Sequence, residues 1–312
     1  MQKVGKIVVL PSISLPGTDQ VSVYEDDAVD ENSLPKLLLP QILEDRLMEH
    51  QKIGVRWLHS RFLSGSGGIL GDDMGMGKTF QVTCLLAGLM KEESIHRVLI
   101  LAPVSVLPSW QRELNQHLLS HIAGLQIYLL NSDVAKKKRL QMLESTFHPS
   151  ARGYSPRIVI SSYQLVSNMI TDFSENGKWD YVILDEGHII KNPSTKTTKS
   201  MHMLPSKHRL ILTGTPIQNN LNELWTVIDW VTKGKNLGTL ANFKRDYTIP
   251  IVAGQDPRAT TEDRQIATIA ASNLHSIIKH IILQRKKCEL FQNNTTTSSN
   301  GSSTNNTANN IN

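Results

Sequence analysis

The chain has 312 residues and a hydrophobic content of 39%, which is enough for a substantial core. Its formal net charge of +5 weakly favours a polyanionic partner, although such a small surplus also serves ordinary solubility. Two cysteines exclude a disulfide framework and a thiolate metal site, and they fit a reducing intracellular compartment.

Three regions follow from composition along the chain. Residues 1–36 mix Pro, Gly, Ser and acidic side chains with little apolar periodicity, which predicts a flexible leader. The opening apolar run ends at Pro11 and is too short for a signal-peptide core or a membrane span, so we expect no membrane contact. Residues 37–291 are predicted to fold, and the Asn/Ser/Thr-rich residues 292–312 to form a disordered tail.

The folded region alternates short apolar runs with amphipathic stretches, which is typical of βαβ units and a parallel sheet. Several runs are apolar without alternation, as in strands covered on both faces. The predicted strands are 67–70, 97–104, 125–130, 156–163, 181–186 and 209–215. The predicted fold class is therefore α/β, with a central, mostly parallel sheet flanked by helices.

Two helices are marked by their first residues. One follows a glycine-rich turn and begins near Lys78, with a broad apolar face. The other runs from Leu221 to near Val231, with Asn220 as its N-cap and Glu223 placed to complete a capping box.

The segment GGILGDDMGMGKTFQ lies between the first predicted strand and the helix at Lys78. Glycine amides and a helix N-terminus form an anion site, in which Lys78 reaches outer phosphates and Thr79 ligates Mg²⁺. A Gly-Lys-Thr triplet alone is a weak signal, and Asp72 stands where the usual P-loop has its first glycine. The strand–turn–helix context still favours a nucleotide site. Its predicted binding residues are Asp72, Met74, Gly75, Gly77, Lys78 and Thr79.

The run YVILDE delivers two adjacent acids, Asp185 and Glu186, to the C-terminal end of a predicted strand. Open α/β sheets bind ligands at that edge. Asp185 is predicted to hold Mg²⁺, directly or through water, and Glu186 to orient or deprotonate the attacking water. An isolated Asp-Glu pair is more often a solvated turn. Its position after the phosphate loop favours a catalytic set of Lys78, Asp185 and Glu186.

Several blocks in the same order resemble the Swi/Snf-type helicase-like ATPases of helicase superfamily two, over about residues 37–287. DEGH is similar to the DEAH box, and residues 47–58 resemble the block whose glutamine, here Gln51, reads adenine. Residues 99–114 and 158–166 resemble two blocks that touch the DNA backbone. In this family an aspartate replaces the first P-loop glycine, as Asp72 does here.

Residues 209–225 resemble the block that couples ATP state to DNA, with Thr213, Gly214 and Thr215 at its centre. The resemblance gives His188 a role linking the acid box to this block. It implies a RecA-like P-loop NTPase lobe with ATP and Mg²⁺ as cofactors. It also implies double-stranded DNA as a partner, further chromatin or repair partners, and a nuclear location. The segments GDDMGMGKT, DEGH and residues 238–251 point to the Cockayne syndrome B and Polo-interacting checkpoint helicase branch.

The block LQRKK, residues 283–287, resembles the end of the family's first lobe. We therefore expect the second lobe, which brings the arginine finger, to be missing, and this chain alone to be weakly active or inactive. Arg285 is not expected to replace that finger, because a residue beside a disordered tail should lack fixed geometry.

Two functions stay open at this point. The chain is the N-terminal half of an ATP-driven double-stranded DNA translocase in repair or chromatin remodelling, or it is a nucleotide-dependent binding or regulatory module without turnover. A P-loop kinase ranks third, because it leaves the adenine-reading and Thr-Gly-Thr blocks unexplained. Simpler interpretations also exist: Gln51 as a surface helix residue, Trp110 and Trp225 as core residues, and Lys136–Arg139 as a solvated helix face.

Overall fold

The computed structural model describes residues 37–148, 155–214 and 220–288. The predicted leader, the predicted tail and the predicted site residue Thr215 lie outside the described residues. The boundaries drawn from composition at residues 36 and 291 therefore stay predictions.

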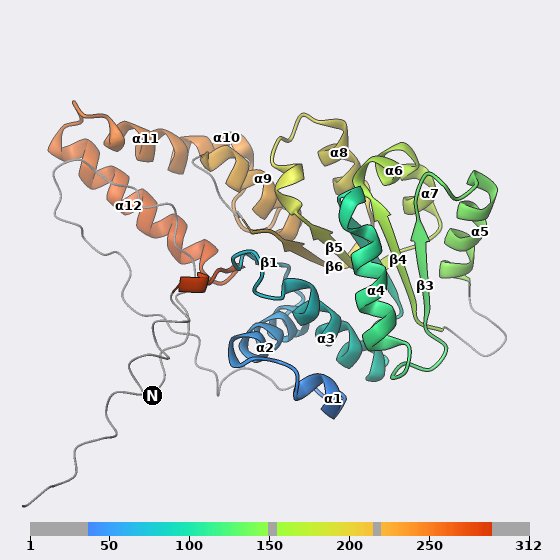
Figure 1. The fold of residues 1–312 in the computed structure, drawn as a ribbon. Coiled ribbons are helices and arrows are strands. Elements are labelled where there is room, and N and C mark those ends of the chain that lie inside the picture. Colours follow the sequence, from blue (N-terminus) through green and yellow to red (C-terminus); the bar gives the residue numbers. More distant parts are fainter. Residues whose placement is uncertain (1–36, 149–154, 215–219, 289–312) are drawn as a thin grey trace, which may run out of the picture.

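A single parallel sheet of seven strands forms the centre of the described structure (Figure 1). The strand order is β3-β4-β2-β5-β6-β1-β7, and every strand pair is parallel. This confirms the predicted fold class. The strands are β1 (Gly68–Leu70), β2 (Arg97–Ala102), β3 (Gln126–Leu130), β4 (Arg157–Ser162), β5 (Trp179–Asp185), β6 (Ser206–Leu212) and β7 (Ile282–Leu283).

All six predicted strands are present, with shifted ends. β2 stops at Ala102 instead of residue 104, because Pro103 has no N–H to give to a strand ladder. β6 begins three residues before its predicted start. β7 was not predicted, since two apolar residues after a helix carry no strand periodicity.

Helices cover both faces of the sheet (Figure 1). The α-helices are α1 (Gln41–Glu44), α2 (Glu49–Leu63), α3 (Lys78–Lys91), α4 (Leu107–Leu118), α5 (Lys136–Phe147), α6 (Tyr163–Asn168), α7 (Ile170–Glu175), α8 (Lys196–Met203), α9 (Leu221–Thr232), α10 (Leu240–Phe243), α11 (Ile249–Gln255) and α12 (Thr261–Ile278). Short 3₁₀ turns occupy Val104–Val106 and Gly187–Ile190, and a π-helical turn spans Lys244–Thr248. None of the described helices is long and apolar enough to cross a bilayer.

The central strands divide their side chains between two cores. In β2, Val98 and Ile100 pack with residues of α2, α3 and α4, whereas Leu99 and Leu101 pack with residues of α5 to α9. Strands buried on both faces read as continuous apolar runs, which explains the absence of alternation in the sequence. Trp110, exposed by 1%, belongs to the first core, and Trp225 packs against the second. The core interpretation is confirmed for Trp110, whereas Trp225 is only half-buried.

The predicted capping box at Asn220 is not formed. The Asn220 side chain does cap α9, but it accepts its hydrogen bond from the Asn222 amide at 3.0 Å. The Glu223 carboxylate instead lies 3.3 Å from the Lys191 ammonium. A charged partner from another segment therefore replaces the local hydrogen bond that the spacing predicted.

The chain leaves the sheet after α9 and returns through α12 (Figure 1). α11 and α12 pack so closely that a Cβ on Gly254 would lie 2.3 Å from the Cβ of Ala267. After α12, β7 pairs with β1. This return brings residues 284–288 next to the loop that follows β1.

Candidate nucleotide-binding site

Residues 71–77 connect β1 to α3 and carry two glycines in the left-handed region. Gly75 has φ 81° and Gly77 has φ 75°, values that glycine adopts with little steric cost. A Cβ on Gly77 would also lie 2.2 Å from Nε2 of Gln51. α3 begins directly at Lys78, and its first amides have no partner within the helix. The loop and the helix N-terminus together have the form of an anion-binding site.

The Lys78 ammonium contacts the loop backbone. It donates to the carbonyl oxygens of Asp72 at 2.6 Å and Asp73 at 3.2 Å. Burial lowers the pKa of Lys78, while the carboxylates of Asp72, Glu186, Asp185 and Asp73 act in the opposite direction. The lysine therefore stands in the field of both acids of the predicted acid box.

Asp185 is the last residue of β5, and its carboxylate is held on both oxygens. Oδ2 accepts a hydrogen bond from Trp110 Nε1 at 2.8 Å, and Oδ1 accepts one from the Glu186 amide at 3.0 Å. Tyr163 donates its hydroxyl to the Asp185 carbonyl at 2.7 Å. Burial raises the pKa of Asp185, and the Trp110 hydrogen bond opposes this shift. The side chain thus has one fixed orientation at the sheet edge.

Glu186 adopts the left-handed conformation, with φ 50° and ψ 45°. For a residue with a Cβ this costs about 1–2 kcal/mol, and such strain gathers at functional positions. Its Oε2 lies 3.3 Å from Nδ1 of His188. The same nitrogen lies 3.3 Å from Oγ1 of Thr213. The imidazole therefore stands between the acid box and the end of β6.

The end of β6 also contacts the phosphate loop. β6 lies between β1 and β5 in the sheet, and the Thr213 amide donates to the Leu70 carbonyl at 3.1 Å. A Cβ on Gly214 would lie 2.9 Å from the Met74 side chain and 3.9 Å from the Lys78 ammonium. Met74 itself is 75% exposed. The structure therefore brings the phosphate loop, the acid box and residues 213–214 to one edge of the sheet.

Gln51 lies on α2 and is 7% exposed, so the surface interpretation of this residue is wrong. Its Nε2 donates to the Met76 carbonyl at 3.2 Å, and its Oε1 accepts from the Met48 amide at 3.0 Å. A side-chain amide has two N–H donors and two oxygen lone pairs, so each end retains capacity for another partner. Adenine reading by Gln51 stays a prediction.

The Asp72 carboxylate is fully buried and forms a two-pronged ion pair with Arg285. Arg285 Nε donates to Oδ1 at 2.9 Å, and the Nη2 group donates to Oδ2. Gln81 Nε2 adds a further hydrogen bond to Oδ2 at 3.3 Å. The expectation that Arg285 lacks fixed geometry is wrong, because this side chain is 1% exposed and anchored by β7.

Four residues at this edge were missed or undervalued by the sequence analysis: Gln81, Arg285, Trp110 and Tyr163. Trp110 and Tyr163 follow β2 and β4, and both hydrogen-bond Asp185. The sequence signal for them was weak: Tyr163 ends the predicted strand 156–163, and Trp110 lies in the helix after the strand that begins at Arg97. The C-terminal ends of such strands meet at one edge in a parallel sheet. Arg285 is 213 positions from Asp72, and no local pattern pairs residues so far apart.

The residues present fit a magnesium–triphosphate group. Among the described residues, no group of three or more His, Cys, Asp or Glu side chains could form a metal cage. Mg²⁺ in nucleotide sites uses one or two carboxylates together with phosphate oxygens, so it needs no such cage. Thr79 at the start of α3 and Asp185 at the end of β5 offer a hydroxyl and a carboxylate of the required kind.

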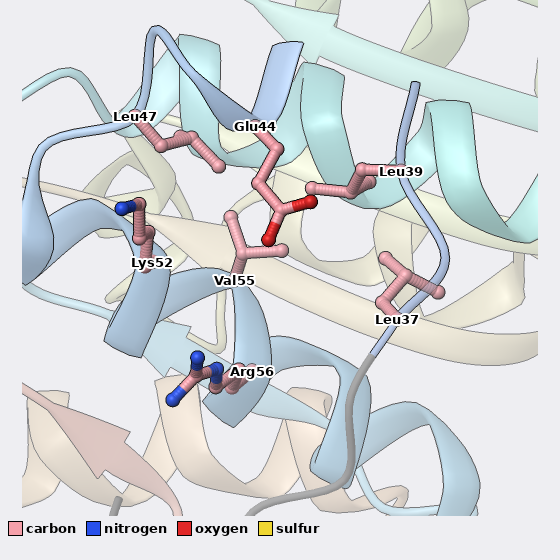
Figure 2. A pocket seen from close by; sticks show the side chains of 7 residues that line it. All are labelled: Leu37, Leu39, Glu44, Leu47, Lys52, Val55 and Arg56. Atoms are coloured by element: carbon pink, nitrogen blue, oxygen red, sulfur yellow. The ribbon is translucent and has the colours of Figure 1, made fainter. Parts of the chain in front are cut away.

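A separate pocket of about 40 Å³ lies between α1, α2 and residues 37–39 (Figure 2). Leucines and a valine form its apolar wall, and Glu44, Lys52 and Arg56 contribute charged groups. None of its seven lining residues belongs to the predicted nucleotide site.

Known proteins resemble this chain in sequence. A family model described as the SNF2-related domain matches residues 50–299. Protein CHROMATIN REMODELING 24 of Arabidopsis thaliana is 38% identical over 287 residues, covering 88% of this chain and 25% of that protein. The DNA excision repair protein ERCC-6-like of Danio rerio is 38% identical over 255 residues, covering 80% of this chain and 17% of that protein. The DNA excision repair protein CSB of Oryza sativa subsp. japonica is 32% identical over 300 residues, covering 89% of this chain and 25% of that protein.

A solved structure agrees with these relatives. The Sulfolobus solfataricus SWI2/SNF2 ATPase core in complex with dsDNA matches with a TM-score of 0.64 and 28% identity, over 81% of this chain and 47% of that one. The chain thus spans about a fifth of the curated relatives' length and about half of the solved core. These matches confirm the resemblance and the RecA-like fold. The chain belongs to the SNF2-related domain family of ATPases, with relatives in DNA repair and chromatin remodelling.

Proposed function

We propose that this chain binds Mg-ATP at the edge formed by β1, β6 and β5. We further propose that it is the ATP-binding lobe of an ATP-dependent double-stranded DNA translocase acting in repair or chromatin remodelling. The observation that carries the proposal is that the loop with Lys78 after β1 and the acid box with Asp185 and Glu186 at the end of β5 lie at one edge of the sheet. The end of β6 lies between them, and a Cβ on Gly214 would come within 3.9 Å of the Lys78 ammonium. The relatives' names and the DNA-bound solved core support the DNA part.

Each side chain at the edge has a task in this proposal. Lys78 exchanges the carbonyl oxygens of Asp72 and Asp73 for outer phosphate oxygens, which bind an ammonium more strongly because they are charged. Thr79 and Asp185 hold magnesium, which when bound neutralises charge on the phosphates. Glu186 orients the attacking water and takes its proton, and His188 lies within reach of the Glu186 carboxylate.

His188 and Thr213 give the site a path to the block that resembles an ATP–DNA coupling element. The imidazole lies 3.3 Å from both Glu186 Oε2 and Thr213 Oγ1. A change in the position of Glu186 on hydrolysis would therefore reach the end of β6 through one ring. We propose coupling roles for His188, Thr213, Gly214 and Thr215 on this basis, and adenine recognition for Gln51.

DNA binding should be tested by titrating the chain with short duplexes over a range of salt concentrations. Backbone contacts release counterions, so we expect weak binding that falls steeply with salt and does not depend on sequence. We propose a nuclear location and chromatin or repair partners as part of the same function, because the relatives are chromatin remodelling and DNA excision repair proteins. Tight, sequence-selective binding that persists at high salt would contradict the motor-lobe proposal.

Turnover separates the translocase from a nucleotide-dependent binding module. In motors of this type ATP lies between two lobes, and an arginine finger contributes about 10³ to 10⁵ in rate. Arg285 is not free to act as one, because it is buried against Asp72. We therefore expect these 312 residues alone to show little ATP hydrolysis, with or without duplex DNA. Robust DNA-stimulated hydrolysis would show that the chain completes its own site.

A further inference from the structure

The chain runs back along the phosphate loop after β7. We call residues 282–287 the return segment. The Gly71 amide donates to the Leu283 carbonyl at 2.7 Å, and the Asp73 amide donates to the Arg285 carbonyl at 3.1 Å. The Lys287 amide donates to the Asp73 carboxylate at 2.9 Å. Backbone hydrogen bonds thus join the return segment to the loop on both sides of Asp72.

Side chains strengthen this junction at its centre. Arg285 holds both carboxylate oxygens of Asp72, and its Nη2 group donates to Gln81 Oε1 at 3.0 Å. Its Nη1 group donates to the His50 carbonyl on α2. Gln81 Nε2 reaches the Met76 carbonyl at 3.3 Å, so the network extends to the far side of the phosphate loop. One guanidinium therefore connects the return segment, α2, α3 and the loop.

The surrounding helix leaves room for this network. Gly54 lies on α2, where a Cβ would come within 1.8 Å of Gln81 Oε1 and 2.8 Å of Arg285 Nη2. Glycine in a helix interior is unfavourable compared with alanine, so its presence here is explained by the polar groups packed against it.

Stability alone does not account for the ion pair. Asp72 and Arg285 are 0% and 1% exposed, and a buried ion pair is often no more stabilising than apolar residues of similar size. What apolar residues cannot supply is the fixed angle of a two-pronged guanidinium–carboxylate contact. The Asp72 carbonyl on the same residue accepts from Lys78. Orientation of Asp72 therefore sets the place of an oxygen that contacts the proposed phosphate-binding lysine.

We propose that Arg285 is a positioning residue for nucleotide binding, which acts through Asp72 and Gln81 to hold the phosphate loop in its binding shape. This inference rests on the proposed function of the same loop. Because binding couplings are reciprocal, a nucleotide that draws Lys78 away from the Asp72 carbonyl also changes how tightly the return segment is held. The return segment is thus linked to the state of the phosphate site.

The first test compares Arg285→Met and Arg285→Lys with a matched control, Arg61→Met, in the full chain. Arg61 donates to the His280 carbonyl at 2.9 Å, so it ties the approach to the return segment without touching Asp72. Loss of an orienting partner in metal sites costs about 10- to 100-fold in affinity. We expect the dissociation constant for Mg-ATP, measured by calorimetry, to rise about tenfold or more in both Arg285 variants. We expect less than about a twofold change in Arg61→Met.

A double variant shows whether Arg285 acts through Asp72. If it does, Asp72→Asn combined with Arg285→Met should bind Mg-ATP no more weakly than Arg285→Met alone, because the two residues form one contact. Additive losses of affinity would contradict the path through Asp72.

Amide hydrogen exchange of residues 73–79 gives a second readout that needs no nucleotide. We expect faster exchange in Arg285→Met and Arg285→Lys than in the wild type or in Arg61→Met, at matched distance from each melting temperature. If Arg285→Met does not fold, Arg285→Lys decides, since it keeps the charge beside Asp72 and loses the fork. Wild-type affinity and wild-type exchange in a folded Arg285 variant would overturn the inference. A wild-type chain that fails to bind Mg-ATP would refute the proposed function. The amide hydrogen exchange of residues 73–79 in the Arg285 variants would then still show whether Arg285 holds the loop in place.

Discussion

Trp110 and Asp185 are joined by a hydrogen bond of 2.8 Å from the indole Nε1 to the carboxylate Oδ2, across 75 residues of sequence. Trp110 lies in the first turn of α4, which follows β2, and Asp185 ends the neighbouring strand β5. A helix within a block that resembles a DNA-contacting element therefore holds the carboxylate proposed to bind magnesium.

Replacing Trp110 with Phe should weaken the magnesium-dependent part of nucleotide binding. The variant keeps an aromatic ring in the core but loses the N–H that orients Asp185. We expect about a tenfold loss of Mg-ATP affinity, the size seen when a metal ligand loses an orienting partner, and a smaller change when magnesium is chelated. Titration calorimetry measures the nucleotide affinity of the wild type and the variant, first with magnesium and then with a chelator.

The matched control for that experiment is Trp179→Phe. Trp179 is also fully buried, but its Nε1 donates to the Phe173 carbonyl at 3.0 Å, inside the second core. This variant should lose stability without a change in the magnesium dependence. Equal magnesium dependence in wild type and Trp110→Phe would show that the hydrogen bond has no part in binding.

Gly187→Ala should destabilise the chain, although it makes the acid box more similar to DEAH. A Cβ at this position would lie 2.5 Å from Cγ2 and 3.2 Å from Cγ1 of Ile211, a branched core side chain on β6. Overpacking of this kind costs about 1–3 kcal/mol. Chemical denaturation of both proteins measures the difference in the free energy of unfolding.

Ile211→Ala provides the control for the steric explanation. Alone it should destabilise by about 2–5 kcal/mol, because it leaves a cavity in the core. Combined with Gly187→Ala, the loss should be smaller than the sum of the two, because the added methyl then has room. Simple additivity would mean that Ile211 is not the group that resists alanine.

His208→Phe should reduce the loss of stability in mild acid. Burial lowers the pKa of His208 to about 4, helped by Lys233, Lys207 and Lys178 and opposed by Asp180. In the unfolded chain its pKa is about 6.5, so the unfolded state takes up the proton first as the pH falls. The stability that depends on neutral His208 is therefore complete above about pH 6.5 and is lost as the pH falls towards 4.

Phenylalanine removes the titrating group and keeps a ring beside Phe62, whose centroid lies 4.2 Å from that of His208. Because His208 is partly exposed, solvent screening reduces the size of the effect. Between pH 7.5 and pH 5 we expect the free energy of unfolding to fall by about 1 kcal/mol less in the variant than in the wild type. Unfolding curves at both pH values measure this. His50, His117 and His202 also have lowered pKa values, so some acid sensitivity should remain. An identical pH profile in both proteins would exclude His208 as a contributor.

Glu186→Gln should separate binding from hydrolysis. The amide keeps the size of the side chain and loses only its capacity as a base. Mg-ATP affinity in the 312-residue chain should stay within a few-fold of wild type. In a motor that contains both lobes, hydrolysis should fall by about 10² to 10⁴, the contribution of general base catalysis. Wild-type turnover in such a motor would remove Glu186 from its proposed role.

Much of the fold could be predicted because its signals are local. The strands are continuous apolar runs, and the glycines before Lys78 mark a turn between an apolar run and an amphipathic stretch. The location of the candidate site could also be predicted, because parallel strands present the loops after β1, β5 and β6 at the same edge of the sheet.

The parts that escaped prediction depend on contacts between distant segments. The ion pair of Arg285 with Asp72 exists only because β7 pairs with β1, and two residues of strand give no periodic signal. Glu223 left its expected capping role because Lys191 comes close to it from another loop. Trp110 was correctly assigned to the core, but its hydrogen bond to Asp185 depends on the neighbouring positions of β2 and β5.

Calorimetric titration of Mg-ATP into the wild-type chain and Lys78→Ala tests the central claim most directly. Lys52→Ala is the matched control, because Lys52 lies on α2 and pairs only locally with Glu49 at 2.7 Å. We predict saturable binding of Mg-ATP to the wild type and to Lys52→Ala. For Lys78→Ala we predict a dissociation constant at least about tenfold larger, which is a loss of about 1.4 kcal/mol of binding free energy. Equal affinity of the wild type and Lys78→Ala would contradict the assignment of this loop as the phosphate site.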